Sequence, residues 1–239
     1  LPPTVLSQDA RELMETVFER LIEKYPGNAR MLEIQYRMNE KLMEFPSREF
    51  YRGRLKAHED VRGITLRDLG IGEAFNSPFW RKVLDEEPLV FIDTSKCPDK
   101  WERQRRGSHS RENPREAQIV KQVVEKLLQL GVRKEWIGVV SPYDDQVDLL
   151  SQMISGVEIS TVDGYQGREK EVIVISFVRS NRRGELGFLE DLRRLNVSLT
   201  RARRKLIAIG DSGTLKTHET YRRFVEFVKR KGRFVEYCW

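Results

Sequence analysis

The chain has 239 residues with 39% apolar side chains, enough to bury a substantial core in one large domain without disulfides. Its two cysteines stand in unrelated contexts without a CxxC pair or neighbouring histidines, so neither a disulfide framework nor a metal site is expected. No apolar run approaches the roughly 18 residues that cross a bilayer, so we expect a cytoplasmic protein without a membrane partner. The net charge of +6 permits polyanion binding, and the 33% of charged residues also suits a heat-adapted (thermophile) protein.

Helices and strands alternate along the chain. Amphipathic spacing predicts helices at about 7–24, 39–50, 114–130, 143–154, 191–202 and 217–231. Compact apolar runs predict strands at 88–93, 136–140, 157–162, 171–178, 205–210 and 234–238. The alternation predicts an α/β fold with a mainly parallel sheet and helices on both faces.

Two segments interrupt this alternation. Glycines break the pattern repeatedly in residues 52–87, which we interpret as an insertion. Residues 99–115 are expected to form a mobile basic loop, because Lys100 to Arg115 contains six lysines or arginines against two acidic residues.

Polar residues follow several of the predicted strands. In parallel sheets, ligands bind beyond the carboxyl ends of the strands, so the residues directly after each strand are the first candidates. These residues are Asp93-Thr94, Ser141-Pro142-Tyr143, 163–169, Arg179 and Gly210-Asp211. We expect them to form the edge of a binding site.

No phosphate-binding loop of the GxxxxGK[ST] type (Walker A) occurs in the sequence, so the chain by itself lacks the standard cradle for nucleotide phosphates. The acidic run Asp85-Glu86-Glu87 precedes an apolar strand instead of ending one, which favours a charged turn over a magnesium site.

Four motif segments carry the information about function. They are Gln35-Tyr36-Arg37-Met38 with Phe45-Pro46-Ser47 and Phe50-Tyr51, then Ser141-Pro142-Tyr143 with Gln146, then Thr161 to Glu169 (TVDGYQGRE), and Leu195 to Arg203 (LNVSLTRAR). In this order and at this spacing they resemble the second RecA-like domain of superfamily 1B helicases, the group that includes the up-frameshift helicase and senataxin. The opening Leu1-Pro2-Pro3 resembles the end of that family's motif III. The resemblance implies that residues 1–239 form one RecA-like (P-loop NTPase-type) domain, a fragment of a longer chain.

The resemblance gives two arginines a role in nucleotide hydrolysis. It implies that Arg37 and Arg201 approach the γ-phosphate of ATP. A guanidinium suits this task because its planar fork stabilises charge spread over the phosphoryl oxygens. ATP and Mg²⁺ are then expected to be held mainly by an N-terminal RecA-like domain, which supplies the Walker lysine and the Mg²⁺-binding carboxylate.

Four further residues are assigned to the nucleotide by resemblance. Tyr36 is expected to pack on the adenine, with a core tyrosine as the alternative. Gln166 is expected to bind the nucleotide, and Gly167 is expected to approach the phosphates, because a glycine lets the backbone come close. Glu169 is expected to accept a hydrogen bond from a ribose hydroxyl, and a surface ion pair with Lys170 or Arg168 is the alternative.

Nucleic-acid contact is expected at another surface. Ser141, Pro142, Tyr143 and Thr161 match family positions that touch the strand backbone through hydroxyl and main-chain groups. The alternative for Pro142 and Tyr143 is a simple helix start. The basic loop either attracts nucleic acid or is a solvated loop.

The sequence therefore predicts the C-terminal motor domain of an ATP-dependent helicase or translocase on single-stranded DNA or RNA, inactive without its N-terminal partner domain. The alternative from another class is a non-catalytic nucleic-acid-binding or scaffold module that keeps the fold without using ATP.

Overall fold

The computed structural model describes residues 1, 15–72 and 75–237. The chain forms two compact units, Leu1–Glu33 and Ile34–Trp239. The first contains helix α1 (Val17–Lys24), and a 3₁₀ turn follows at Pro26–Asn28, where the sequence predicts the helix to stop. Residues 7–14 of the helix predicted from about residue 7 lie outside the described residues. The helix begins only at Val17, because the Thr16 hydroxyl accepts from the Glu19 N–H at 3.1 Å and caps it.

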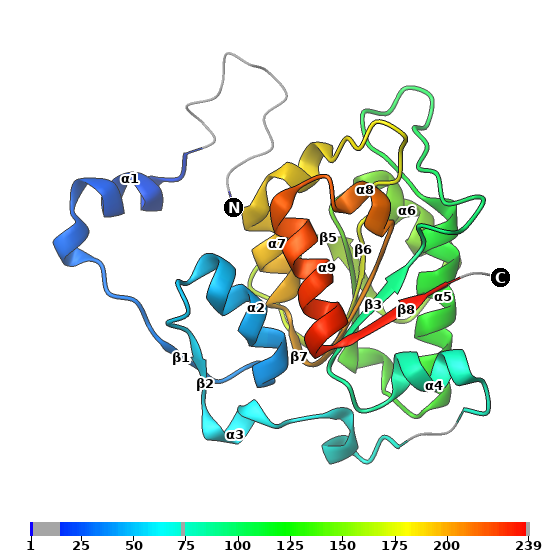
Figure 1. The fold of residues 1–239 in the computed structure, drawn as a ribbon, viewed down its shortest axis with the longest axis horizontal. Helices are drawn as coiled ribbons and strands as arrows, with labels where there is room; N and C mark the ends of the chain where they lie inside the picture. The colour runs from blue at the N-terminus through cyan, green and yellow to red at the C-terminus, as the bar shows by residue number, and fades with distance from the viewer. Residues whose placement is uncertain (2–14, 73–74, 238–239) are drawn as a thin grey trace. The chain divides into compact units, whose positions relative to one another are not determined.

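A six-stranded parallel sheet forms the centre of the second unit (Figure 1). In spatial order its strands are β5 (Glu158–Thr161), β4 (Ile137–Ser141), β6 (Lys170–Ser176), β7 (Ala202–Gly210), β3 (Leu89–Asp93) and β8 (Arg233–Glu236). All six coincide with apolar runs that predict strands. Every residue of β3 and β4 is buried, as is typical of parallel strands covered on both faces.

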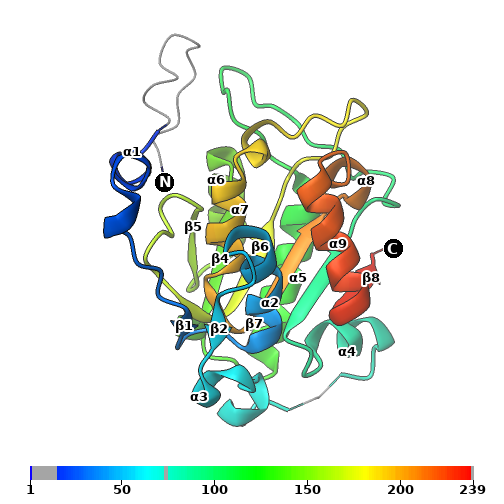
Figure 2. The same ribbon diagram turned by 60° about the vertical axis from the view of Figure 1, so that its left-hand side comes forward.

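Helices cover both faces of this sheet (Figures 1 and 2). One face carries α4 (Pro78–Leu84), α5 (Pro114–Gln129) and α6 (Asp144–Met153), the other carries α2 (Glu40–Phe50), α7 (Leu192–Leu199) and α9 (Glu219–Lys231), and α8 (Ser212–Leu215) follows β7. Val90 and Ile92 of β3 join the apolar residues of α5 in one core cluster. Phe91, between them, packs on Phe224 of α9 with ring centroids 6.3 Å apart. The predicted fold, an α/β architecture with a parallel sheet and helices on both faces, is confirmed.

The connection from α7 to β7 lies three residues earlier than the pattern predicts. The helix ends at Leu199 with Thr200 as its C-terminal cap, and the strand already begins at Ala202. Arg201 therefore lies in the connection between the two elements. Arg203 and Arg204 belong to the strand, where the sequence pattern had not placed them.

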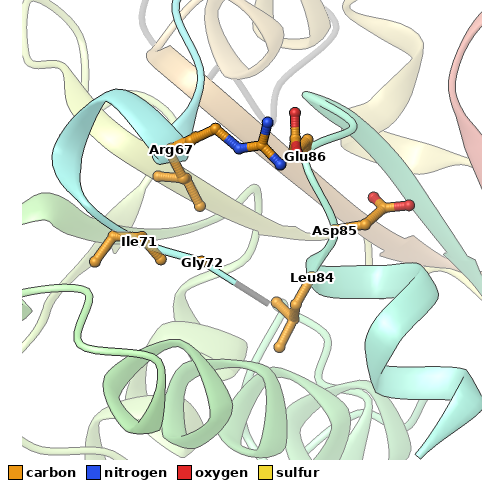
Figure 3. A pocket seen from close by; sticks show the side chains of 7 residues that line it. Arg67, Ile71, Gly72, Leu84, Asp85 and Glu86 are labelled. Atoms are coloured by element: carbon orange, nitrogen blue, oxygen red, sulfur yellow. Dashed lines mark ion pairs between the residues drawn. The ribbon is translucent and has the colours of Figure 1, made fainter. Parts of the chain in front are cut away.

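Residues 52–87 are integrated into the second unit. They form β2 (Lys56–Ala57), which pairs with β1 (Ile34–Gln35), then α3 (Glu59–Arg62), a 3₁₀ turn (Leu66–Leu69) and α4. Leu66, Phe79 and Leu84 lie in the same core cluster as β3. Arg67 and Glu86 pair above a small hollow of about 20 Å³, which brings the two ends of the 66–86 stretch together (Figure 3). The glycine-broken pattern gave no sign of α4 or of this packing.

The basic segment 99–115 has no helix or strand before α5, as expected for a loop. It is not free, however, because Arg103 and Glu112 form an antiparallel backbone bridge with N···O distances of 2.8 and 3.0 Å. The buried Glu112 carboxylate also accepts from the side chains of Arg103 and Arg105, both at 2.6 Å. The buried carboxylate of Glu112 thus binds two arginines of this loop, and the mobility of the loop stays a prediction.

Candidate functional site

Arg37, Glu169 and Arg201 lie together at the amino edge of the sheet, although they are far apart in the sequence. Arg37 lies between β1 and α2, while Glu169 directly precedes β6 and Arg201 directly precedes β7. Lys170 pairs with Ala202 in the parallel register, which makes Glu169 and Arg201 neighbours. This edge is opposite to the one predicted from strand ends, because these residues precede their strands instead of following them.

Glu169 connects two of the arginines in this cluster. One of its carboxylate oxygens accepts from Arg37 Nε, and the other lies 3.4 Å from Arg203 Nη1. Arg37 Nη1 also donates to the Thr200 carbonyl at 3.1 Å, so the guanidinium is fixed at both ends. Arg168 and Lys170, the alternative partners considered for Glu169, both pair with Glu158 instead.

The Arg201 guanidinium is held by the chain on three sides. It donates to the carbonyls of Val197 at 3.0 Å and Arg168 at 3.2 Å, and to the Thr200 hydroxyl at 3.2 Å. Burial and then the charge of Arg37 lower the pKa of Arg201 below its usual range. This is the direction expected where cations are crowded together and partly desolvated. An anion placed here would relieve that repulsion.

Tyr36 is presented outward beside this cluster. Its side chain is 61% exposed, and its ring stacks on His58 with centroids 4.3 Å apart. The alternative of a core tyrosine is therefore wrong. Gln35 holds the turn: its Oε1 accepts from the N–H groups of Arg37 at 2.8 Å and Met38 at 2.7 Å. Sequence reasoning gave Gln35 no role of its own, because the role depends on this turn.

Gln166 and Gly167 lie on the turn between β5 and β6, and both are exposed. Gly167 has φ of +84°, a left-handed conformation that favours glycine. A Cβ at this position would have no heavy atom within 4 Å, so the backbone is open to an approaching group. The interpretation of Gly167 as a point of close backbone approach is compatible with this geometry.

The four residues assigned to nucleic acid lie at the carboxyl edge, but only two of them are accessible. Ser141 is fully buried, and Tyr143 is 2% exposed. The Tyr143 hydroxyl donates to the Leu186 carbonyl at 3.1 Å and accepts from Arg179 at 3.2 Å. The expectation that these two hydroxyls contact nucleic acid directly is wrong, because both lie inside the domain. Tyr143 is instead the N-cap of α6, which is the alternative considered from the sequence.

Pro142 and Thr161 are partly exposed at the same edge. The Thr161 hydroxyl accepts from the Gly164 N–H at 3.2 Å, which leaves its own proton free for an outside acceptor. The Val162 N–H donates to the Ser141 carbonyl at 3.0 Å, so the ends of β4 and β5 are tied together.

The other polar residues after the strands bind one another. Asp211 accepts from the Ser180 hydroxyl at 2.7 Å and pairs with Lys100 at 3.0 Å. Burial alone would raise the pKa of Asp211, but the hydrogen bonds from Ser180 and Lys100 lower it. Asp93 accepts from the Ser212 N–H at 2.9 Å. These groups therefore stabilise the carboxyl edge of the sheet by binding one another.

Within residues 15–72 and 75–237, no three His, Cys, Asp or Glu side chains gather in a way that could hold a metal ion. In the same part of the chain, no helix is both long and apolar enough to cross a membrane.

Comparison with known proteins places these residues in a family. A family model described as an AAA domain matches residues 13–213. Over 96% of its length the chain is 46% identical to an uncharacterized ATP-dependent helicase of Methanocaldococcus jannaschii, of which it covers 33%. It is 40% identical to the DNA-binding protein SMUBP-2 of Mesocricetus auratus, over 97% of this chain and 23% of that protein. It is 39% identical to the DNA polymerase alpha-associated DNA helicase A of Saccharomyces cerevisiae, over 90% of this chain and 33% of that protein.

The chain thus spans about a quarter to a third of the length of these relatives. The family match covers all four motif segments, including both arginines at the amino edge. The chain therefore belongs to the AAA domain family and is a RecA-like C-terminal domain of the superfamily 1 helicase type.

Proposed function

We propose that this chain is the C-terminal motor domain of an ATP-dependent helicase or translocase that moves on single-stranded DNA. The names of its relatives, ATP-dependent helicases and a DNA-binding protein, favour DNA over RNA. ATP binds between this domain and an N-terminal RecA-like domain, which supplies the phosphate loop and the Mg²⁺ ligands. Bound Mg²⁺ neutralises phosphate charge.

One observation carries the nucleotide half of the proposal: two guanidiniums contact a single carboxylate at the amino edge, and the guanidinium of Arg201 lies beside them. Arg37 and Arg203 both contact Glu169, and burial together with the charge of Arg37 lowers the pKa of Arg201. Arg203 also pairs with Glu171, but Arg37 and Arg201 remain crowded together, and cations crowded in this way form a site that an anion stabilises. A nucleotide triphosphate brought against this edge supplies that charge, and the sequence itself has no phosphate loop to hold one alone.

The roles of the individual residues follow from their anchors. Arg37 and Arg201 are fixed by main-chain carbonyls and present their remaining N–H groups to the γ-phosphate. Tyr36, supported from behind by His58, offers its exposed ring to the adenine. Glu169 is half-exposed between two arginines, and we assign its carboxylate to a ribose hydroxyl once the phosphates attract the arginines.

The nucleic-acid half of the proposal uses the opposite edge. Thr161 donates its hydroxyl proton to a backbone phosphate, and Pro142 shapes the surface beside it. Ser141 and Tyr143 support this surface from below instead of touching the strand. Because the two edges belong to the same sheet, closing of the nucleotide site moves the nucleic-acid surface as one body.

Hydrolysis of ATP by the longer protein, with and without single-stranded DNA or RNA, tests this proposal. Stimulation by DNA supports the proposal, and stimulation by RNA alone would mean that the motor moves on RNA instead of DNA. No hydrolysis by the folded protein with Mg²⁺ present would contradict the motor and favour the non-catalytic binding module. Arg37→Ala should lower kcat by about 10³-fold, whereas Arg223→Ala on the surface of α9 should leave it unchanged.

A further inference from the structure

Two loops meet at the carboxyl edge and are joined by two hydrogen bonds between Glu102 and Ser180. One follows β3 and includes residues 100–112, and the other follows β6 and includes residues 178–186. The Glu102 N–H donates to the Ser180 carbonyl at 3.1 Å, and the Ser180 N–H donates to the Glu102 carboxylate at 2.7 Å. We define the loop platform as the exposed Trp101 and Arg182 of this junction together with the exposed Arg106 further along the first loop.

Most cations of the first loop are already neutralised. Arg103 and Arg105 pair with Glu112, Arg111 lies 3.6 Å from Glu102, and Lys100 pairs with the buried Asp211. These arginines shape the loop and add little free positive charge. If this loop attracts nucleic acid, which is one of the two alternatives considered from the sequence, only a few of its side chains are available to do so.

Arg106 and Arg182 differ from the others. Both are exposed, and neither has an ion-pair partner among residues 15–72 and 75–237. They come from different loops, and the hydrogen bonds between Glu102 and Ser180 hold both loops at the same edge. Unpaired exposed arginines are the side chains that gain most from a phosphate ligand.

Trp101 lies at this junction and remains 40% exposed. The Lys100 ammonium lies 4.9 Å from its ring centroid, and the Arg182 guanidinium lies 5.6 Å from it. Lys100 is tied down by the Ser95 carbonyl at 2.8 Å and by Asp211. The Arg182 side chain has no hydrogen bond or ion pair among the described residues, so it can move away from the ring. An indole with one fixed and one movable cation is suited to stack on a flat ligand that carries negative charge.

The loop platform lies on the same edge as Thr161. The Arg105 guanidinium donates to the Asp145 carbonyl at 3.0 Å, which joins the first loop to the start of α6 directly after β4. Thr161 ends β5, the neighbour of β4, and the second loop follows β6 on its other side. Since neighbouring strands are about 4.8 Å apart, the ends of β5 and β6 are separated by about 10 Å. A short single strand crossing the edge spans that distance.

We propose that Trp101 stacks on a base of single-stranded nucleic acid while Arg182 and Arg106 bind its phosphates, so that the loop platform extends the track beyond Thr161. This inference rests on the proposed function and names a contact surface that the motif segments do not include. Stacking of bases on aromatic side chains beside a basic surface tolerates any sequence, as a translocating motor requires.

The chain offers a matched control for the cation and aromatic pair. Arg133 lies 5.1 Å from the ring centroid of Trp136, in the turn that precedes β4 at the amino edge. It has nearly the same geometry as the Arg182 and Trp101 pair but lies at the opposite end of the sheet. If cation and aromatic pairs only stabilise the fold, substitutions in the two pairs have the same consequences.

Binding of a fluorescein-labelled oligo-dT by the longer protein, measured by fluorescence anisotropy, tests the proposal. Trp101→Leu should weaken the affinity about tenfold or more, and Trp101→Phe should retain most of it. Arg182→Ala should weaken binding and lower the slope of log affinity against log salt by about one. Arg133→Ala should leave affinity and slope unchanged. Melting temperatures confirm that each variant is folded, and Arg182→Ala carries the test if Trp101→Leu does not fold.

The outcomes separate this inference from the proposed function. If the wild-type protein does not bind oligo-dT or oligo-rU at any salt concentration, the proposed motor function fails. If the wild type binds but Trp101→Leu and Arg182→Ala bind equally well, the loop platform is overturned while the motor function stands.

Discussion

Alanine substitutions of Arg201 and of Arg204, a comparable arginine in the adjoining strand β7, together separate an effect on catalysis from an effect on stability. Arg201 makes three hydrogen bonds to the chain, with distances of 3.0, 3.2 and 3.2 Å. Arg204 also makes three, to Glu171 at 2.7 Å and to Thr65 and Asp68 at 3.0 Å each. Each hydrogen bond contributes roughly 0.5–1.5 kcal/mol, so both substitutions should lower the free energy of unfolding by about 1.5–4.5 kcal/mol.

The two variants should differ in turnover. An arginine that stabilises the phosphoryl transition state contributes about 10³-fold or more to the rate, which corresponds to about 4 kcal/mol of the activation free energy. Arg201→Ala should therefore lower kcat by about 10³-fold, with a smaller change in nucleotide affinity. Arg204→Ala should keep kcat near the wild-type value, because Arg204 binds Glu171, Thr65 and Asp68, which are not assigned to the nucleotide.

The assay is steady-state ATP hydrolysis by the longer protein at saturating single-stranded DNA, with thermal unfolding measured on the same samples. Arg201→Lys keeps the charge but loses the planar fork, so its kcat should fall nearly as far as that of the alanine variant. Equal losses of kcat in Arg201→Ala and Arg204→Ala, or no loss in either, would refute the catalytic assignment of Arg201.

Three further predictions concern single residues of the fold. The Tyr165 hydroxyl is buried without a hydrogen-bond partner among the described residues, so Tyr165→Phe should leave the melting temperature unchanged or raise it; a clear decrease would contradict this reading. Burial raises the pKa of Glu116 from 4.5 to about 8, so the folded chain keeps the proton that the unfolded chain releases. Stability should therefore fall as the pH rises from about 4.5 to 8, and Glu116→Gln should flatten this dependence in thermal unfolding; an identical slope in both proteins would contradict it. Gly167 and Gly156 have φ of +84° and +80°, so alanine at either position should cost about 1 kcal/mol of stability, but only Gly167→Ala should raise the KM for ATP. Equal KM values for the two glycine variants would remove Gly167 from the nucleotide site.

The sequence predicted the sheet well because its strands are continuous apolar runs buried on both faces. β3 shows the reason: Phe91 and its two neighbours pack into different cores, so no polar residue interrupts the run. The helix α4 was missed, because Gly70 and Gly72 dominate the pattern that precedes it. Local breakers obscure a short helix whose stability comes from packing.

The candidate site was predictable in composition but not in location. The motifs named Arg37, Glu169 and Arg201, yet only the register of β6 and β7 shows that they share the amino edge. The burial of Ser141 and Tyr143 could not be read from a polar triplet, because it depends on loops that cover the carboxyl edge. Motif residues give chemistry, and the three-dimensional contacts decide which of them are accessible.

The split nucleotide site is the central claim, and ATP hydrolysis by the 239-residue chain alone, compared with the longer protein, tests it most directly. Both proteins are measured with Mg²⁺ and single-stranded DNA after circular dichroism shows that they are folded. A nucleotide site split between two domains predicts DNA-stimulated hydrolysis by the longer protein and none by the chain alone. Robust Mg²⁺-dependent hydrolysis by the chain alone would contradict it.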